Sequence, residues 1–227
     1  MQQLCTNFGL AAKLAVLPEE LLSASIKYPF IFDKSMIPPE FMELHKGSTK
    51  TSNWLLPGHI VMSSYPGDML LDTARQKIRN FIELDKVRTF VSLQEPDEMK
   101  RFRPYRDLVI EEAQKMGIPT DHFEFLNFPI PDMGVQTDDK VHEFTNDLVD
   151  RVQNKNQVIL LHCFGGHGRT GTIASIVMTK LFPHLSVNEV LLRVALAHDS
   201  REDPRGFPAP QTRYQVEQVY RFAKEFR

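Results

Sequence analysis

One short stretch constrains the fold of this chain more than any other. Residues 159–171 read ILLHCFGGHGRTG, an apolar run followed by a glycine-rich turn and then by residues that begin a helix. This order predicts a buried strand that ends at Cys163 and a helix that begins near Arg169. A glycine-rich turn before a helix offers backbone N–H groups and the positive end of the helix dipole to an anion. Because such a position also favours the thiolate form of a cysteine, the stretch predicts a nucleophile inside an oxyanion-binding turn.

Strand and helix patterns alternate along most of the chain. Runs of β-branched and aromatic residues predict strands over residues 59–63, 87–93, 123–128 and 157–161. Apolar spacing and capping signals predict helices over residues 68–84, 103–116, 137–152, 186–198 and 212–226, besides the one that begins near Arg169. This alternation predicts an α/β fold, a three-layer sandwich with a central, mostly parallel sheet flanked by helices. The cysteine then lies at the carboxyl end of a strand, where open α/β sheets bind ligands.

The first part of the chain carries weaker signals. Pro29, Pro38 and Pro39 are expected to interrupt regular structure there. The aromatic residues of this part argue against disorder; they are Tyr28, Phe30, Phe32 and Phe41. We therefore expect residues 1–50 to form an N-terminal extension packed on a main domain of residues 51–227.

Composition and charge exclude several classes of partner. The formal net charge of the 227 residues is −2, which gives no bulk attraction to nucleic acid or to an anionic membrane. No apolar run approaches the roughly 18 residues of a membrane span, and the N-terminus lacks the basic segment of a secretory signal. The two cysteines, Cys5 and Cys163, fit free thiols in a reducing compartment better than a disulfide framework. We therefore expect a cytoplasmic protein that binds neither nucleic acid nor membrane.

The reactive stretch also resembles a known signature. His162 and Cys163, then five residues, then Arg169 and Thr170 match the Cys-x5-Arg pattern of the protein tyrosine phosphatase superfamily. Within it the chain resembles the dual-specificity, atypical branch, above all the cyclin-dependent-kinase-inhibitor-associated type with its Cys-x-Gly-Gly-x-Gly-Arg loop. The resemblance covers about residues 54–226 and implies hydrolysis of phosphate monoesters through a phosphocysteine intermediate.

Phosphoryl transfer assigns roles to the residues of this loop. Cys163 would attack phosphorus, while Arg169 and the backbone amides between them would hold the phosphoryl oxygens. The residues expected to bind the substrate phosphate are therefore Phe164, Gly165, Gly166, His167, Gly168 and Arg169. Thr170 is expected to donate a hydrogen bond to the sulfur and make it a better leaving group. The resemblance implies that His162 orients the loop by side-chain hydrogen bonds, while His167 is either a solvated turn residue or a substrate contact.

A general acid must come from a second loop. Residues 129–135 read PIPDMGV, which predicts a loop and looks like the mobile acid loop of the family, with a proline before its aspartate. Asp132 would protonate the leaving oxygen and then, as a carboxylate, activate water. The alternative is a turn aspartate bonded to the local backbone. Asp138 and Asp139 are rivals, although they fit better in the first turn of a helix capped by Thr137.

A third motif starts the last helix. Residues 210–215 read PQTRYQ and resemble the glutamine loop of the family, which implies that Gln211 positions the hydrolytic water, with Gln215 in support. By itself, a glutamine at a helix start is an ordinary polar surface residue. Agreement of this motif with the other two argues against a pseudophosphatase.

Two groups of charged residues near these motifs carry weaker signals. Glu95, Asp97 and Arg101 could line the reactive loop, but they fit a solvated turn better. Arg201 and Arg205 would flank the entrance and could bind a second acidic group, although scattered basic residues usually serve solubility.

Together the motifs predict a cysteine-dependent phosphatase whose partner is a phosphorylated protein, with phosphotyrosine as substrate and phosphoserine or phosphothreonine as further candidates. No metal ion or organic cofactor is expected, because no cluster of side chains has the spacing of metal ligands. Three alternatives stay open: a phosphoinositide or inositol phosphate phosphatase on the same scaffold, a phosphoprotein-binding pseudophosphatase, and a rhodanese or arsenate reductase. The reactive loop contains no lysine, which favours a protein monoester over a highly charged inositide, while His167 keeps the inositide open. The oligomeric state is not predicted.

Overall fold

A five-stranded sheet forms the middle layer of the protein. The computed structural model describes residues 14–23 and 37–225. The strands are β1 (Ser52–Leu56), β2 (Ile60–Ser63), β3 (Thr89–Ser92), β4 (Glu124–Asn127) and β5 (Ile159–His162). Their order is β1-β2-β5-β3-β4, with β1 antiparallel to β2 and every other pair parallel. The predicted α/β fold with a mostly parallel central sheet is confirmed.

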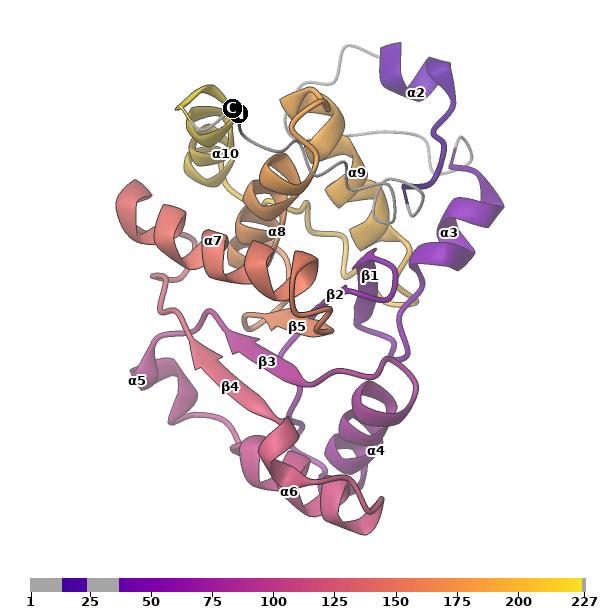
Figure 1. Ribbon diagram of the computed structural model, residues 1–227, viewed down its shortest axis with the longest axis vertical. Coiled ribbons are helices and arrows are strands. Elements are labelled where there is room, and N and C mark those ends of the chain that lie inside the picture. The colour runs from indigo at the N-terminus through magenta and orange to yellow at the C-terminus, as the bar shows by residue number, and fades with distance from the viewer. Residues whose placement is uncertain (1–13, 24–36, 226–227) are drawn as a thin grey trace.

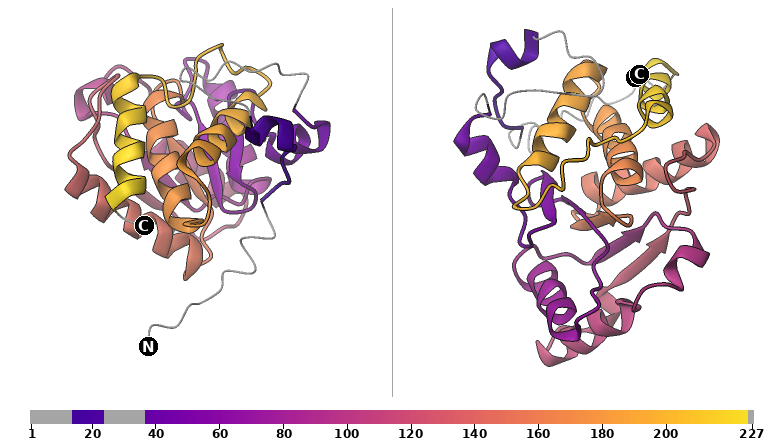
Figure 2. Two further views of the ribbon diagram at one scale, coloured as in Figure 1. Left: turned by 90° about the horizontal axis from the view of Figure 1, so that it is seen from above. Right: turned by 180° about the vertical axis from the view of Figure 1, so that it is seen from behind.

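Helices cover both faces of this sheet. One face carries α4 (Leu71–Glu83) and α6 (Arg106–Lys115). The other carries α7 (Asp138–Gln153), α8 (Gly168–Leu181), α9 (Val187–Asp199) and α10 (Arg213–Glu225). Figure 1 shows these two groups on opposite sides of the strands. Seen from above in Figure 2, α10, α8 and α9 lie side by side, which gives the three layers that the alternating pattern predicts.

Alternation of side chains along the strands divides the core in two. Met62 and Leu161 are paired in register, and both belong to the cluster that packs on α7 to α10. Their chain neighbours Val61 and Leu160 are also paired but belong to the cluster under α4 and α6. This follows from the period of two in a strand, and it explains why strands buried on both faces read as continuous apolar runs.

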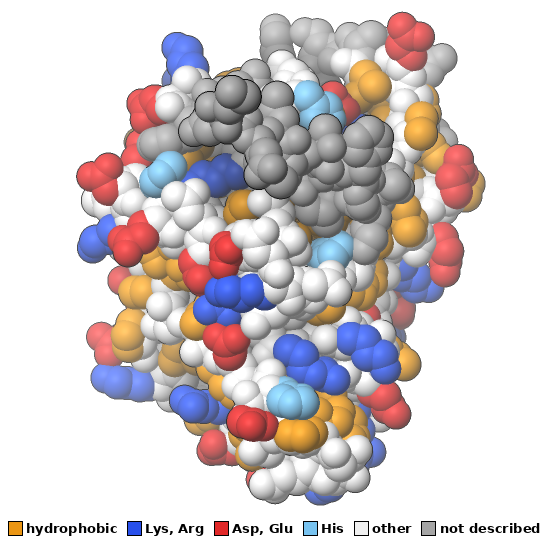
Figure 3. Space-filling view, viewed as in Figure 1, with side chains coloured by type: hydrophobic (Ala, Val, Ile, Leu, Met, Phe, Trp, Pro, Cys, Tyr) orange, Lys and Arg blue, Asp and Glu red, His pale blue; other side chains and the backbone are white. Residues whose placement is uncertain are grey.

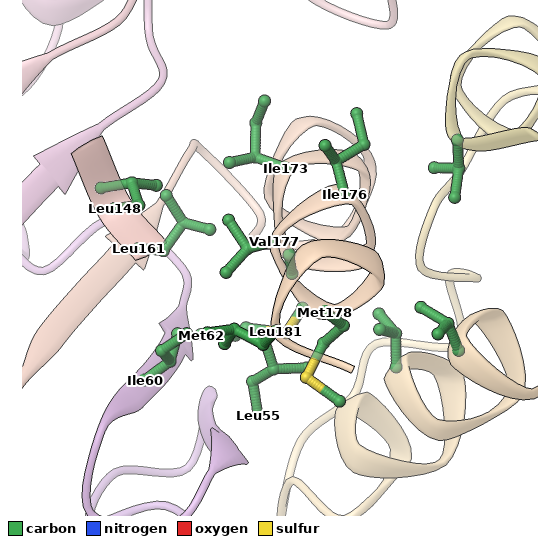
Figure 4. Close-up of a cluster of buried hydrophobic side chains, with 14 of the residues drawn as sticks. Leu55, Ile60, Met62, Leu148, Leu161, Ile173, Ile176, Val177, Met178 and Leu181 are labelled. Carbon is green, nitrogen blue, oxygen red and sulfur yellow. The ribbon is translucent and has the colours of Figure 1, made fainter. Parts of the chain in front are cut away.

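The most buried helix is α8, which follows the reactive stretch. Thirteen of its 14 residues are buried, so it lacks the polar face of a surface helix. In Figure 4, Leu161 and Met62 project from the sheet toward Val177 and Leu181 of α8. Close packing on the sheet and on three neighbouring helices holds the amino end of α8 in place beside the end of β5.

Most predicted elements are present with small shifts at their ends. The described residues also include α2 (Glu19–Ser23), β1, the helix α3 (Pro39–His45), the short helix α5 (Pro96–Met99) and a single 3-10 turn, η2 (Thr120–His122). The prediction that Pro39 interrupts regular structure is wrong, because Pro39 occupies the first turn of α3, where no backbone N–H is needed. Thr137 stands at the N-cap of α7 as predicted, but its side chain makes no capping hydrogen bond.

The described part of the first 50 residues lies against α9. Leu17, Leu21 and Phe41 share a small apolar cluster with residues of α9. Tyr28, Phe30, Phe32 and Cys5 lie outside the described residues, so the extension and its boundary at residue 50 stay a prediction. None of the helices described in residues 14–23 and 37–225 combines the length and the hydropathy needed to cross a bilayer.

A buried carboxylate ties α6 to α4. The Glu112 side chain has no exposed surface, and it accepts hydrogen bonds from Arg79 Nε at 2.5 Å, from Lys115 Nζ at 2.7 Å and from Arg75. Burial alone would raise the pKa of Glu112, but the hydrogen bonds from the three cations outweigh it and lower the pKa from 4.5 to about 2.

We predict that Glu112→Gln lowers the free energy of unfolding by about 2 kcal/mol near neutral pH, because three cations lose their shared acceptor. The lowered pKa makes the contribution of Glu112 complete above about pH 4.5 and absent below about pH 2. The difference between the two proteins should therefore shrink as the pH falls through this window. Urea denaturation across the window measures it, and a difference that stays constant down to about pH 2 would contradict the role of the charge.

Candidate active site

The cysteine loop (residues 163–169) joins the carboxyl end of β5 to the first turn of α8. Gly166 has a φ of +75°, and a Cβ at this position would lie 2.4 Å from the Ser63 carbonyl oxygen, so only glycine fits the turn. Its N–H donates to Cys163 Sγ at 3.3 Å. Tyr65 N–H donates to the Phe164 carbonyl at 2.9 Å, which fastens the loop to the segment after β2. The turn therefore places a backbone donor directly on the sulfur.

Arg201 holds the same loop from behind. Its side chain is only 4% exposed, and it donates to the carbonyl oxygens of Gly165 at 3.4 Å and Gly166 at 3.0 Å and to Asn53 Oδ1 at 2.7 Å. The expectation that Arg201 flanks the entrance is wrong, because the loop carbonyls draw the guanidinium into the interior. Burial lowers the pKa of Arg201 to about 9, so it still carries its charge at neutral pH.

Arg169 is fixed by two segments that lie far from it in the chain. It donates to Glu98 through both terminal nitrogens, at 2.5 and 2.9 Å, and to the Ile130 carbonyl at 3.1 Å. Its guanidinium is almost fully buried. Burial alone would lower the pKa of Arg169, but the hydrogen bond to Glu98 raises it, so the group stays charged.

Glu98 was not singled out in the sequence, although its neighbours were. Residues 95–98 carry a usable signal, a capping box with proline at the first position of α5 and Glu98 at its third. The solvated-turn interpretation holds for Asp97, which pairs on the surface with Lys100. It misses Glu98, whose carboxylate is brought to Arg169 by the fold.

Asp132 lies on the acid loop (residues 129–135), between β4 and α7. Its side chain is 69% exposed, and its Oδ1 lies 3.0 Å from Arg169 Nη2. The same oxygen accepts the N–H of Met133 at 3.0 Å, the local turn contact weighed as the alternative. Of the three candidate acids only Asp132 lines the pocket above Cys163, while Asp138 binds Arg221.

Gln215 fastens the acid loop to α10. Gln215 is fully buried; its Oε1 accepts the N–H groups of Gln211 at 3.1 Å and Thr212 at 3.0 Å. Its Nε2 donates to the Gly134 carbonyl at 3.1 Å. Gln215 therefore orders both the acid loop and the segment that leads into α10. Gln211 lines the pocket beside Cys163.

The two histidines are buried in different surroundings. His162 contacts Tyr105 Oη at 2.8 Å and the Cys163 carbonyl at 3.3 Å, a set of side-chain hydrogen bonds of the kind that the resemblance implies. His167 is 6% exposed and contacts His198 at 2.7 Å, so the solvated-turn alternative is wrong. Burial lowers the pKa of both His162 and His167 to about 3, which leaves both rings neutral. In the sequence Tyr105 reads as one residue of the apolar stripe of a helix, and nothing there indicates its contact with His162.

Thr170 departs from its expected geometry. Its hydroxyl is buried and has no hydrogen-bond partner within the described part of the chain, so it does not donate to the sulfur. The turn at Gly166 places a backbone N–H on Cys163 Sγ instead.

The cysteine loop, the acid loop and the start of α10 border one pocket of about 190 Å³. Its lining includes Cys163, Arg169, Asp132 and Gln211, with exposed Phe164 at its edge. A thiol, a charged guanidinium, a carboxyl group and an amide therefore face one space, the set of groups that in-line displacement at an oxyanion needs. Over residues 14–23 and 37–225, no three His, Cys, Asp or Glu side chains are grouped to hold a metal ion.

Comparison with solved structures shows the same fold. Tk-PTP in its active form superposes with a TM-score of 0.56 at 23% identity, over 78% of this chain and 98% of that one. The kinase associated phosphatase with its catalytic cysteine replaced by serine gives 0.56 at 19% identity, over 73% and 86%. PTPMT1 in complex with PI(5)P gives 0.54 at 18% identity, covering 77% of this chain and 95% of that one.

Comparison of sequences places the chain in a family. It is 32% identical over 114 residues to cyclin-dependent kinase inhibitor 3 of Rattus norvegicus; the match covers 50% of this chain and 46% of the relative, so the chain spans about half of that protein's length. Residues 49–184 match the family model PTP-SAK, described as a Swiss Army Knife protein with a DSP-PTPase phosphatase domain. This match ends before Gln211. It takes in β1, the acid loop and the cysteine loop, and the chain belongs to this family of dual-specificity-type phosphatase domains.

Proposed function

We propose that the protein hydrolyses phosphate monoesters on phosphorylated proteins through a phosphocysteine intermediate. One observation carries the proposal: Cys163 and a charged Arg169 line the same pocket. The sulfur of Cys163 accepts a backbone N–H, and Glu98 holds the guanidinium of Arg169. A sulfur nucleophile beside a fixed guanidinium suits a substrate whose reacting centre bears several anionic oxygens.

In the first step Cys163 Sγ attacks phosphorus, and the S–P bond forms as the bond to the leaving oxygen breaks. Arg169 and the loop amides of residues 164–168 neutralise the phosphoryl oxygens. Asp132 transfers its proton to the leaving oxygen, which departs as a neutral hydroxyl group. Its exposed position on a loop over the pocket supports this role.

In the second step a water molecule attacks the phosphocysteine. Asp132, now a carboxylate, takes a proton from the water, and Gln211 orients it. The S–P bond breaks and releases inorganic phosphate. The Gly166 N–H, which lies 3.3 Å from Cys163 Sγ, steadies the departing thiolate in the place expected for the Thr170 hydroxyl.

The rim of the pocket supports a protein substrate. Met133, Phe164 and Phe207 are each about half exposed and line the pocket, so they offer apolar contact to the side chain that carries the phosphate. The cysteine loop contains no lysine, which a highly charged inositol ring would favour. Phosphotyrosine fits the apolar rim best, because its ring buries more apolar surface than serine or threonine.

A free thiol is a further requirement of this chemistry. Cys163 forms no disulfide among the described residues and is buried. A thiolate nucleophile is oxidised readily, so the enzyme works in a reducing compartment, and we place it in the cytoplasm.

Phosphate release from matched substrates tests the proposal. We expect higher kcat/KM on phosphotyrosine, phosphoserine or phosphothreonine peptides than on soluble inositol phosphates or phosphoinositide vesicles. Cys163→Ser should abolish release from all of them, because the serine hydroxyl is not ionised at neutral pH.

Three other results of this test would each indicate a different function. A preference for inositides would replace protein by inositide as the substrate. Phosphopeptide binding by Cys163→Ser without turnover by the unmodified protein would indicate a binding module, and sulfur transfer from thiosulfate would indicate a rhodanese.

The acid is tested with substrates of different leaving groups. We predict that Asp132→Asn lowers kcat about 100-fold on phosphotyrosine peptide, since asparagine cannot protonate the leaving oxygen. The loss should be much smaller on p-nitrophenyl phosphate, whose leaving group needs little protonation. Asp139→Asn is the matched control and should leave both rates unchanged; the reverse pattern would reassign the acid to Asp139.

A further inference from the structure

Helix α10 and the residue before it carry a line of polar side chains that all bind the acid loop or the residues just after it. These side chains are three residues apart along the chain: Thr212, Gln215, Gln218 and Arg221. Residues at this spacing are neighbours on a helix surface and form one ridge across it. We call these four side chains the α10 clamp.

The first half of the α10 clamp binds the acid loop itself. Thr212 Oγ1 donates to the Met133 carbonyl at 3.3 Å. Gln215 Nε2 donates to the carbonyl of the next residue, Gly134, at 3.1 Å. Successive members of the clamp therefore bind successive residues of the loop.

The second half of the α10 clamp binds the residues that lead from the acid loop into α7. Gln218 is 1% exposed, and its Nε2 donates to the Gln136 carbonyl at 2.7 Å and to Asp138 Oδ1 at 2.6 Å. Arg221 donates to both carboxylate oxygens of Asp138, at 2.8 and 3.0 Å. The hydrogen bond from Arg221 lowers the pKa of Asp138, which keeps this carboxylate charged. Asp138 therefore anchors the amino end of α7 to α10.

The opposite end of the acid loop is fastened to the sheet. Ile130 N–H donates to the Leu93 carbonyl just after β3 at 3.1 Å. The Ile130 carbonyl accepts a hydrogen bond from Arg169 Nη1, also at 3.1 Å. The tip of the loop, with Asp132, therefore lies between two anchored ends.

The tip itself is held in a strained turn. Gly134 N–H donates to the Pro131 carbonyl at 2.9 Å and closes the turn around Asp132. Met133 has a φ of +59°, a left-handed value that is costly for a residue with a side chain. Such a conformation persists only where its surroundings hold it, and the hydroxyl of Thr212 on the Met133 carbonyl is one of the contacts that do so.

We propose that Gln218 and Arg221 are positioning residues for the general acid: the α10 clamp keeps the acid loop over the pocket, so that Asp132 stays close to the leaving oxygen throughout turnover. The proposal rests on the function proposed above, and it departs from the mobile loop that the resemblance implies. A displacement of about 1 Å in a reacting group can lower a rate about 100-fold, so a loop fixed at this many points has a direct effect on proton transfer.

Short-range contacts, and not charged surfaces, hold the two segments together. Outside the grey atoms, the face shown in Figure 3 intersperses basic and acidic side chains. In the same view, Figure 1 shows α10 beside the amino end of α7. Attraction between surfaces of mixed charge is weak, and salt screens it beyond about 10 Å. Substitution of single members of the α10 clamp is therefore a direct test.

Substrates with different leaving groups provide the first measurement. Gln218→Met keeps the size of the side chain and removes both of its hydrogen bonds. We expect about tenfold lower kcat on phosphotyrosine peptide, because Asp132 is no longer held at the leaving oxygen, with KM within about twofold. On p-nitrophenyl phosphate, whose leaving group needs little protonation, kcat should change by less than about twofold. A residue that only stabilises the fold would lower both rates alike.

A double substitution tests whether Gln218 acts through the acid. In the Asp132→Asn protein, Gln218→Met should change kcat on the peptide by less than about twofold, because the group that it positions can no longer donate a proton. The same tenfold loss in both backgrounds, or equal losses on the two substrates, would overturn the proposal.

Arg221 provides a second variant that leaves the core intact, since its side chain is 45% exposed. Arg221→Gln should lower kcat on the peptide about threefold and spare p-nitrophenyl phosphate, and Arg221→Lys, which keeps a cation beside Asp138, should recover part of the loss. Arg213→Gln is the matched control, because Arg213 also belongs to α10 but pairs on the surface with Glu217 at 2.7 Å. Its rates should equal those of the unmodified protein. Unchanged peptide rates in both Gln218→Met and Arg221→Gln would contradict the proposal.

Hydrogen exchange separates the α10 clamp from the proposed function. Amides of residues 131–138 should exchange about tenfold faster in Gln218→Met than in the unmodified protein, whether or not any substrate is hydrolysed. In the unmodified protein, saturating orthovanadate should change their exchange by less than about twofold, because the loop is already held over the pocket. Equal exchange in the two proteins, or strong protection of the loop by vanadate, defeats the clamp alone. Absence of hydrolysis with the exchange difference intact defeats only the proposed function.

Discussion

The ion pair between Arg169 and Glu98 is the interaction on which the pocket depends. Arg169 lies in the first turn of α8, Glu98 lies 71 positions earlier on α5, and the Ile130 carbonyl on the acid loop completes the set. A buried charge left without its partner costs about 3–5 kcal/mol, so the three segments stabilise one another only in this arrangement. The guanidinium is thereby oriented before a substrate arrives, which is how a fixed charge contributes most to a transition state.

Electrostatics around the cysteine loop follow from burial. His162 and His167 are kept neutral because burial lowers the pKa of each ring to about 3. Positive charge at the catalytic pocket therefore comes from guanidinium groups and not from imidazoles. Arg201 adds charge behind the loop while it binds the loop carbonyls, so one side chain serves both the shape of the turn and its positive potential.

Much of the fold could be predicted because its elements are long and regularly spaced. β5 and α8 follow from one continuous run of residues, and burial of α8 follows from its lack of a polar face. The elements that were missed are short or depend on partners. β1 is a strand because β2 pairs with it, and α3 begins at a proline that reads equally well as a break. Periodicity over four to seven residues does not distinguish these cases.

Cys163, the glycines and Arg169 are close in the chain, so the sequence alone predicts the chemistry of the cysteine loop from local geometry. It also indicated Asp132 and Gln211, which the fold brings to the same pocket. The fold adds groups from distant segments that local spacing does not reveal: Glu98 on Arg169, Tyr105 on His162 and Arg201 behind the loop. The order of the strands explains this. β5 lies between β2 and β3, so segments far apart in the sequence meet at one edge of the sheet, and no local spacing records which side chains will face one another there.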